Sequence, residues 1–308
     1  MDKKTYYVEN PLKEAQMSSE RQFKQVDVFT HHDFQGNPLA VILNAEGLSD
    51  EQMQAIARWT NLSETTFVLP PTDPTADYLV RIFTPSHELP FAGHPTLGTA
   101  HALLEAGLTP HVPGQLIQQC GVGLIPINLS DNGQLAFRAP EATIDAVDAS
   151  HYALIDTALG SNHRHGEVPP SVVSMGINWM IVRMDSAASC LGVRIAQPAF
   201  EKLLAATGAD GIAIYGPHEN ATPTDYEVRA FFPLDSVIED PVTGSANACI
   251  ARALQHGNDL DKVTRKLGYS VRQGTMLYRN GRVNVAYIDS QPWIGGYSRT
   301  LIDGTLNV

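Results

Sequence analysis

A duplicated pattern in the sequence restricts the folds that the chain can adopt. The stretches 81–85 (RIFTP) and 229–233 (RAFFP) share the pattern RxFxP, and each leads through a turn-rich loop into an apolar segment that begins at Gly93 or Gly244. The two arginines are 148 residues apart and the two glycines are 151 residues apart. Because repeated structural units leave repeated sequence patterns, we interpret the chain as two related halves.

Each apolar segment has the composition of a helix that is buried on all sides. Both segments are rich in Ala and Leu, and each carries one charge near its far end, Glu105 or Arg252. A helix that is apolar all round must be enclosed by other elements, and short predicted strands flank both segments. The sequence therefore predicts an α+β fold of two pseudo-symmetric halves, each a curved, mostly antiparallel sheet wrapped around a central apolar helix. In the second half we also expect a hairpin over 278–285, with its turn at Asn280-Gly281.

The start of each predicted helix is suited to bind an anion. The first turn of a helix exposes unpaired N–H groups and carries about half a positive charge. Gly93 and Gly244 stand at these positions, where the missing Cβ lets a ligand approach the backbone. If the halves pack with pseudo-twofold symmetry, both helix starts meet at the interface, where ligand pockets are common. A small carboxylate could then bind there without a metal ion or a basic cluster.

Four polar residues near the helix starts are candidates for the chemistry. Glu64 precedes the predicted strand 65–69, where partial burial would raise its pKa and suit it to general acid–base catalysis. His94, Asp240 and Ser245 lie beside the two glycines. Each residue also has a structural interpretation: a solvated carboxylate for Glu64, a helix cap or core histidine for His94, a turn residue for Asp240 and a helix cap for Ser245. The residues alone leave these alternatives open.

Composition limits the classes of protein to which the chain can belong. The 308 residues carry a formal net charge of −12, and no basic cluster is present, which argues against nucleic-acid binding. Three separated cysteines without a CxxC pattern indicate a reduced intracellular chain, so we expect a cytoplasmic protein. The sequence shows no membrane span and no secretory signal. It also lacks P-loop, hydrolase, zinc-protease and dinucleotide motifs, so we expect neither a metal ion nor a cofactor.

From about Phe23 onward, the chain resembles the PhzF-like isomerase family of phenazine biosynthesis. The resemblance implies the fold of diaminopimelate epimerase, with two similar α+β halves around a central cleft, and a homodimer. The stretches that carry it occur in the family's order and are QVDVFT (25–30), GNPLAVIL (36–43), NLSETTFV (61–68), RIFTPSHELPFAGHPTLG (81–98) and EDPVTGSA (239–246).

The resemblance also implies roles for single residues. Glu64 would be the acid and base that moves a proton between substrate carbons. His94 and Asp240 would take part in proton handling, and Ser245 would help to bind the substrate. At the helix starts, Gly93 and Gly244 would offer backbone N–H groups to a substrate carboxylate.

Cysteines are missing where the related epimerases need them. Those enzymes use two cysteines, one beside each helix start, whereas Ala92 and Thr243 stand at the matching positions here. The three cysteines of the chain lie elsewhere, at positions 120, 190 and 249. We therefore do not expect an epimerase that uses two thiols. We expect an isomerase with one catalytic carboxylate.

These observations together predict a cofactor-independent isomerase. We expect it to move a proton between carbons of a small carboxylate, dihydro-hydroxyanthranilate-like or related, in a cleft between the halves. The alternative is a non-catalytic protein that binds small carboxylates on the same fold. The expected divisions are an N-terminal tail (1–21), a first domain (22–142 plus about 288–308) and a second domain (143–287). The expected partners are the substrate and a second copy of the chain, without nucleic acid or membrane.

Overall fold

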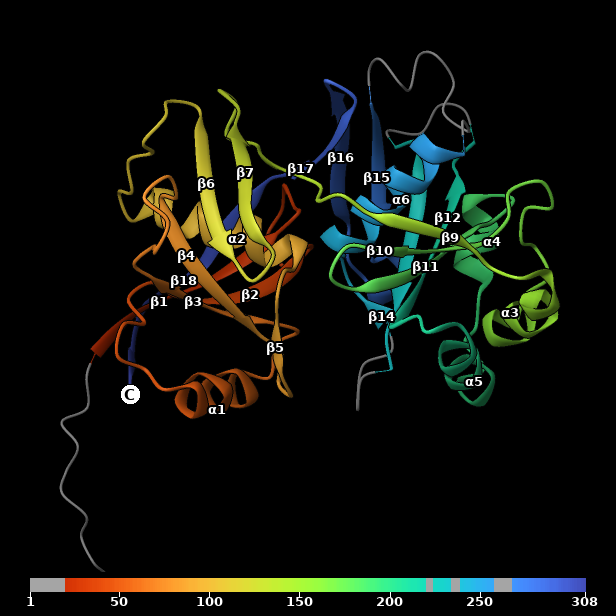
Figure 1. The fold of residues 1–308 in the computed structure, drawn as a ribbon, viewed down its shortest axis with the longest axis horizontal. Helices are drawn as coiled ribbons and strands as arrows, with labels where there is room; N and C mark the ends of the chain where they lie inside the picture. The colour runs from red at the N-terminus through yellow and green to blue at the C-terminus, as the bar shows by residue number, and fades with distance from the viewer. Residues whose placement is uncertain (1–19, 220–223, 234–238, 258–267) are drawn as a thin grey trace, which may run out of the picture.

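The computed structural model describes residues 20–219, 224–233, 239–257 and 268–308, and two lobes lie side by side in it (Figure 1). Both lobes combine curved sheet with a central helix, as the duplicated pattern predicts. The expected N-terminal tail falls almost wholly outside the described residues, since β1 begins at Glu20. The helices are α1 (Asp50–Thr60), α2 (Gly93–Glu105), α3 (Tyr152–Leu159), α4 (Ala187–Gly192), α5 (Gln197–Thr207) and α6 (Gly244–His256).

The first lobe is formed by strands that surround α2. All residues of α2 from Gly93 to Ala100 are buried, which is the enclosure that an apolar helix requires. A Cβ on Gly98 would lie 2.6 Å from Leu39 Cδ2 and 2.8 Å from Val28 Cγ2, so this glycine permits close packing of helix and sheet. The strands are β1 (Glu20–Val28), β2 (Asn37–Ile42), β3 (Thr65–Leu69), β4 (Tyr78–Phe83), β5 (Glu88–Leu89), β6 (Gln115–Cys120), β7 (Gly123–Leu129) and β8 (Leu135–Arg138).

The second lobe repeats this arrangement around α6, whose residues from Gly244 to Arg252 are all buried. Two parallel pairings occur in each lobe at corresponding places: β2 with β3 and β4 with β6 in the first, β11 with β12 and β13 with β15 in the second. All other pairings between the named strands are antiparallel, as predicted. The strands are β9 (Thr143–Ala146), β10 (Ser171–Ser174), β11 (Asn178–Arg183), β12 (Gly211–Pro217), β13 (Tyr226–Phe231), β14 (Glu239–Asp240), β15 (Tyr269–Gln273) and β16 (Gly281–Ile288).

The last two strands connect the lobes. Strand β17 (Gln291–Gly296) pairs with β16 on one side and with β8 on the other. Strand β18 (Ser298–Asn307) returns to the first lobe and pairs with β1. The domain boundaries expected from the sequence remain a prediction.

The expected hairpin at Asn280-Gly281 is wrong. The chain does reverse before Gly281, but as a longer connection over 274–280 between the antiparallel strands β15 and β16, which contains the short 3₁₀ helix Thr275–Leu277. The two-residue reversal lies between β16 and β17, at Asp289-Ser290. Both turn residues at this point have positive φ angles, 50° and 61°. Such angles suit a two-residue hairpin turn, and the Asp-Ser pair is a weaker sequence indication of one than Asn-Gly.

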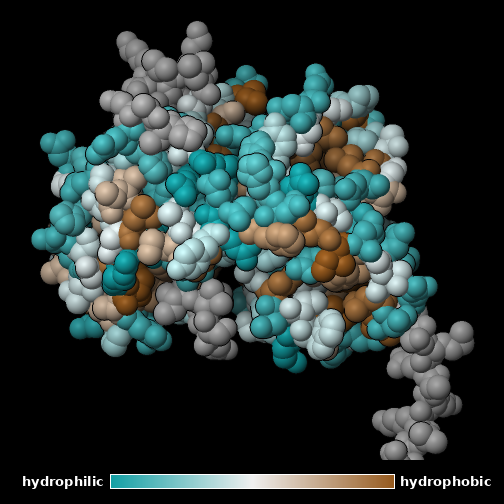
Figure 2. All heavy atoms as spheres, turned by 180° about the vertical axis from the view of Figure 1, so that it is seen from behind, coloured by the Kyte–Doolittle hydropathy of each residue, from teal (hydrophilic) through white to brown (hydrophobic). Residues whose placement is uncertain are grey.

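The face opposite to that of Figure 1 is largely hydrophilic, with hydrophobic patches on both lobes (Figure 2). Among the described residues, no helix combines the length and the apolar character that crossing a bilayer would need.

Candidate active site

A cavity of about 410 Å³ lies where the starts of α2 and α6 meet. Loop and strand residues of both lobes line it, and so do all six residues selected from the sequence. The structure thus brings together side chains that are up to 181 positions apart in the chain. The six are Glu64, Gly93, His94, Asp240, Gly244 and Ser245.

The two helix starts touch each other through their glycines. A Cβ on Gly93 would lie 2.6 Å from Gly244 Cα, and a Cβ on Gly244 would lie 2.8 Å from Gly93 Cα. Neither helix has a side-chain cap at its N-terminus or an acidic residue in its first turn. The N–H groups and the positive ends of both helix dipoles are therefore available to an anion in the cavity.

Glu64 and His94 lie next to each other among the residues that line this cavity. The distance between Glu64 Oε2 and His94 Nε2 is 3.3 Å, and the two side chains are 15% and 4% exposed. In the described part of the chain, neither atom forms a hydrogen bond despite this closeness. Both atoms are thus buried next to each other with their hydrogen-bonding capacity unused among the described residues.

Asn37, the first residue of β2, sets the tautomer of His94. Its Nδ2 donates to Asp240 Oδ1 (3.0 Å) and to the Val242 carbonyl (2.9 Å), and lies 3.3 Å from His94 Nδ1. The two amide hydrogens go to these two oxygens, so the longer contact with His94 Nδ1 can only share one of them; since an amide nitrogen does not accept, the contact favours the neutral His94 tautomer with its hydrogen on Nε2. His94 therefore presents a hydrogen-bond donor on the side of Glu64.

A buried network from several elements donates hydrogen bonds to Asp240. Asn37, Thr243 and Ser63 all donate hydrogen bonds to its carboxylate. Gln273 of β15 donates to Thr243 Oγ1 (2.9 Å), so the Thr243 hydroxyl hydrogen is directed to Asp240. Three donors to one carboxylate favour its ionised form.

The protonation states of the three ionisable groups differ for physical reasons. Burial raises the pKa of Glu64 well above its usual value, and the charge of Asp240 adds to this rise. Burial raises the pKa of Asp240 to about 6, although its hydrogen bonds oppose the rise. Burial lowers the pKa of His94 to about 3, so this ring is neutral at pH 7. The carboxyls of Glu64 and Asp240 therefore both keep a proton to higher pH than usual, whereas the His94 ring is neutral at pH 7.

Replacing Asp240 by Asn is expected to move the pH profile. Loss of the negative charge beside Glu64 lowers the pKa of Glu64 toward its usual range. If Glu64 is the base, kcat/KM rises with pH through this pKa, and the acidic limb moves to lower pH in Asp240→Asn. We would measure kcat/KM against pH for this variant and for Asp145→Asn, which changes an exposed aspartate on β9. An acidic limb at the wild-type position in a folded Asp240→Asn protein would contradict the coupling.

The sequence did not identify three residues that support the site. Asn37, Gln273 and Trp179 are fully buried, and each forms a hydrogen bond to a residue of the cavity wall. Asn37 lies within the stretch GNPLAVIL, which supports the family resemblance but does not by itself distinguish this asparagine from a turn residue. For Gln273 and Trp179 no sequence pattern indicates a role.

Thiols are absent from the two helix starts, as expected. Ala92 and Thr243 are the N-cap residues of α2 and α6, while the three cysteines lie buried elsewhere. Burial raises the pKa of the Cys249 thiol, and that of Cys190 likewise, which keeps both protonated. Within the described ranges, no group of three or more His, Cys, Asp or Glu side chains is arranged to hold a metal ion.

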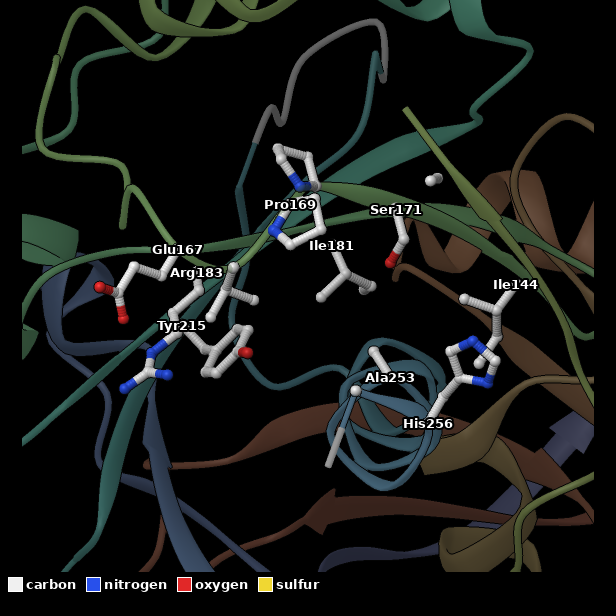
Figure 3. A pocket seen from close by; sticks show the side chains of 13 residues that line it. Ile144, Glu167, Pro169, Ser171, Ile181, Arg183, Tyr215, Ala253 and His256 are labelled. Atoms are coloured by element: carbon white, nitrogen blue, oxygen red, sulfur yellow. The ribbon is translucent and has the colours of Figure 1, made fainter. Parts of the chain in front are cut away.

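A second cavity, of about 360 Å³, lies in the second lobe (Figure 3). The Tyr215 and Ser171 oxygens point into it, with Glu167 and Arg183 on one side and His256 on the opposite side. It contains none of the six predicted residues. The helix starts and the paired Glu64 and His94 therefore identify the first cavity as the candidate active site.

Comparison with known proteins places these features in a family. A family model described as "Phenazine biosynthesis-like protein" (PhzC-PhzF) matches residues 26–304. Antisense-enhancing sequence 1 of Schizosaccharomyces pombe is 33% identical over 300 residues, covering 93% of this chain and 98% of that protein. The trans-2,3-dihydro-3-hydroxyanthranilate isomerase of Pseudomonas chlororaphis is 35% identical over 241 residues, covering 75% of this chain and 79% of that enzyme. The crystal structure of a PhzF-family protein from Bacillus anthracis superposes with a TM-score of 0.80 at 26% identity, covering 94% of this chain and 100% of that chain.

Proposed function

The chain belongs to the phenazine biosynthesis-like protein family and is an isomerase, and from this premise we propose that Glu64 moves a proton between two carbons of a small unsaturated carboxylate. One observation carries the proposal: the free, buried Glu64 Oε2 lies 3.3 Å from His94 Nε2 beside two uncapped helix starts. A proton acceptor, a hydrogen-bond donor and an anion site thus share one cavity.

In this proposal the substrate carboxylate binds at the helix starts. The N–H groups around Gly93 and Gly244 and the two helix dipoles stabilise its negative charge. The close approach of the two glycines allows one anion to interact with both helices at once. No lysine or arginine is among the residues that line the described part of the cavity, so the helix starts supply the positive potential.

The ionised Glu64 then removes a proton from the carbon that the bound carboxylate makes acidic. Negative charge develops on the substrate, and His94 Nε2–H, the Ser245 hydroxyl and the helix N–H groups stabilise it. The protonated Glu64 returns the proton to a second carbon, and the double bond moves toward the carbon that lost its proton. Burial and the charge of Asp240 raise the pKa of Glu64, which strengthens this glutamate as a base and lets it hold the proton until it is returned.

The relatives suggest the first substrate to test. Since the Pseudomonas chlororaphis relative is a trans-2,3-dihydro-3-hydroxyanthranilate isomerase, we would incubate the purified protein with that acid and with related unsaturated carboxylates, and follow isomer formation by ¹H NMR. Isomer formation from at least one of them supports the proposal. Calorimetric binding of these acids without any conversion would favour the non-catalytic carboxylate-binding protein instead.

Assembly and location form a separate part of the proposal. The homodimer and the cytoplasmic location that the sequence predicts are kept as proposals. Light scattering on the purified protein would test the first, and a monomer at micromolar concentration would contradict it.

A further inference from the structure

The two lobes differ at the position of the proposed base. In the first lobe Thr65 pairs with Phe83 of the RxF pattern, and in the second lobe Ile212 pairs with Phe231 of the same pattern. Counting back one residue from each pair, the counterpart of Glu64 is Gly211. The second lobe therefore has no side chain where the first lobe has its acid.

The space beside Gly211 is filled by the Phe231 carbonyl oxygen and by two aromatic side chains. A Cβ at this glycine would lie 2.8 Å from Trp179 Cζ3 and 3.0 Å from Phe232 Cδ1. Trp179 is fully buried, and its ring centroid lies 4.3 Å from that of Phe232, which lines the cavity. The tryptophan thus lies directly behind the cavity wall, at a place where a larger residue at position 211 would displace it.

The indole of Trp179 also determines how Ser245 can act. Its Nε1–H donates to Ser245 Oγ at 3.1 Å. An indole nitrogen only donates, so the serine oxygen accepts and keeps its own hydrogen for another partner. Among the described residues the hydroxyl has no other hydrogen bond, and Ser245 lines the cavity.

Ser245 corresponds in the second lobe to His94 in the first. Each is the second residue of its central helix, and each accepts a hydrogen bond from the start of a neighbouring strand: His94 Nδ1 from Asn37 of β2, Ser245 Oγ from Trp179 of β11. In both cases the hydrogen that remains is free for the cavity. Asn37 and Trp179 are chemically different donors, but each leaves its partner with a hydrogen to donate.

We propose that Trp179 is a positioning residue that holds the Ser245 hydroxyl as a hydrogen-bond donor to the substrate. This inference rests on the proposed function, because the donated hydrogen acts on the negative charge that proton removal creates. Trp179 itself does not line the cavity, so it acts only through Ser245.

A double-mutant cycle tests the proposal. Loss of one donor to a developing negative charge typically costs 10²–10³-fold in kcat, so we expect Ser245→Ala to lower kcat about 100-fold. Trp179→Phe keeps most of the ring volume and removes the N–H, and we expect about a tenfold loss of kcat with KM within about threefold of wild type. The double variant is expected to match Ser245→Ala within about twofold, because residues that act as one unit are not additive. Losses that multiply in the double variant would overturn the proposal.

Two further measurements separate positioning from folding and from the proposed function. Trp59→Phe changes an indole that is 77% exposed and is expected to leave kcat unchanged. The indole N–H resonance of Trp179, assigned in ¹⁵N spectra by its loss in Trp179→Phe, is expected to shift upfield in Ser245→Ala. An unchanged resonance would overturn the hydrogen bond even if the wild-type protein proved inactive, whereas inactivity of the wild type with a shifted resonance would count against the proposed function alone.

Discussion

Replacing Glu64 by Gln is expected to lower kcat by about 10²–10⁴-fold, the usual contribution of general acid–base catalysis. The amide has nearly the same shape but cannot take a proton from carbon. The neighbouring atoms of the site, including His94 Nε2 at 3.3 Å, stay in place. We would measure kcat on a carboxylate that the wild-type protein converts, with Glu46→Gln, an exposed loop glutamate, as the matched control.

Stability distinguishes a loss of chemistry from a loss of fold in this variant. Burial raises the pKa of Glu64 in the folded state, so its contribution to stability is fully present below the unfolded pKa and is lost as pH rises through the folded pKa. Gln carries no charge and escapes this loss. Glu64→Gln is therefore expected to unfold at the same or a higher temperature than wild type at pH 8. A variant that keeps kcat within threefold of wild type would contradict the assignment of Glu64 as the base.

Replacing Gly93 by Ala is expected to be the most damaging single change at the helix starts. The new Cβ would lie 2.6 Å from Gly244 Cα and carbonyl carbon and 2.8 Å from Ser245 N. These are backbone atoms, which no side-chain rotation can move away. Overpacking costs typically 1–3 kcal/mol, and we expect a loss near the upper end, about 3 kcal/mol, together with a fall in kcat of at least about 10²-fold as the N–H donors separate.

Denaturant unfolding and kcat measure these two effects. Gly192→Ala is the matched control, since a Cβ at this position meets nothing within 4 Å; its stability is expected to change by no more than about 0.5 kcal/mol. If Gly93→Ala were as stable and as active as Gly192→Ala, the close approach of the two helix starts would not be part of the site.

Much of the fold follows from the repeated pattern in the sequence. A helix without a polar face must be enclosed by other elements. Two such helices, each after the same RxFxP pattern, indicate two lobes. The pattern also locates Gly93 and Gly244 at the helix starts. The contact between these two glycines depends on how the lobes pack. The sequence predicted it only if the two halves pack with pseudo-twofold symmetry, and the structure shows the contact.

The supporting residues of the site lie beyond what the sequence can indicate. Gln273 and Trp179 are determined by contacts between segments that are 30 or more positions apart. A buried glutamine or tryptophan in a strand has no periodicity that separates support from core packing. The missed turn at Asp289-Ser290 has a local cause, because Asn280-Gly281 is the stronger turn pair but lies in the loop before β16.

The most direct test of the account follows the C–H bond that Glu64 is proposed to break. A converted carboxylate is prepared with deuterium at its acidic carbon, and mass spectrometry with NMR follows departure of the label, whether to solvent or to a second carbon of the same molecule. We predict that the label leaves its carbon in the wild-type protein and in Glu46→Gln, and that it leaves at least about 100-fold more slowly in Glu64→Gln. Departure at the wild-type rate from a folded Glu64→Gln protein would contradict the account.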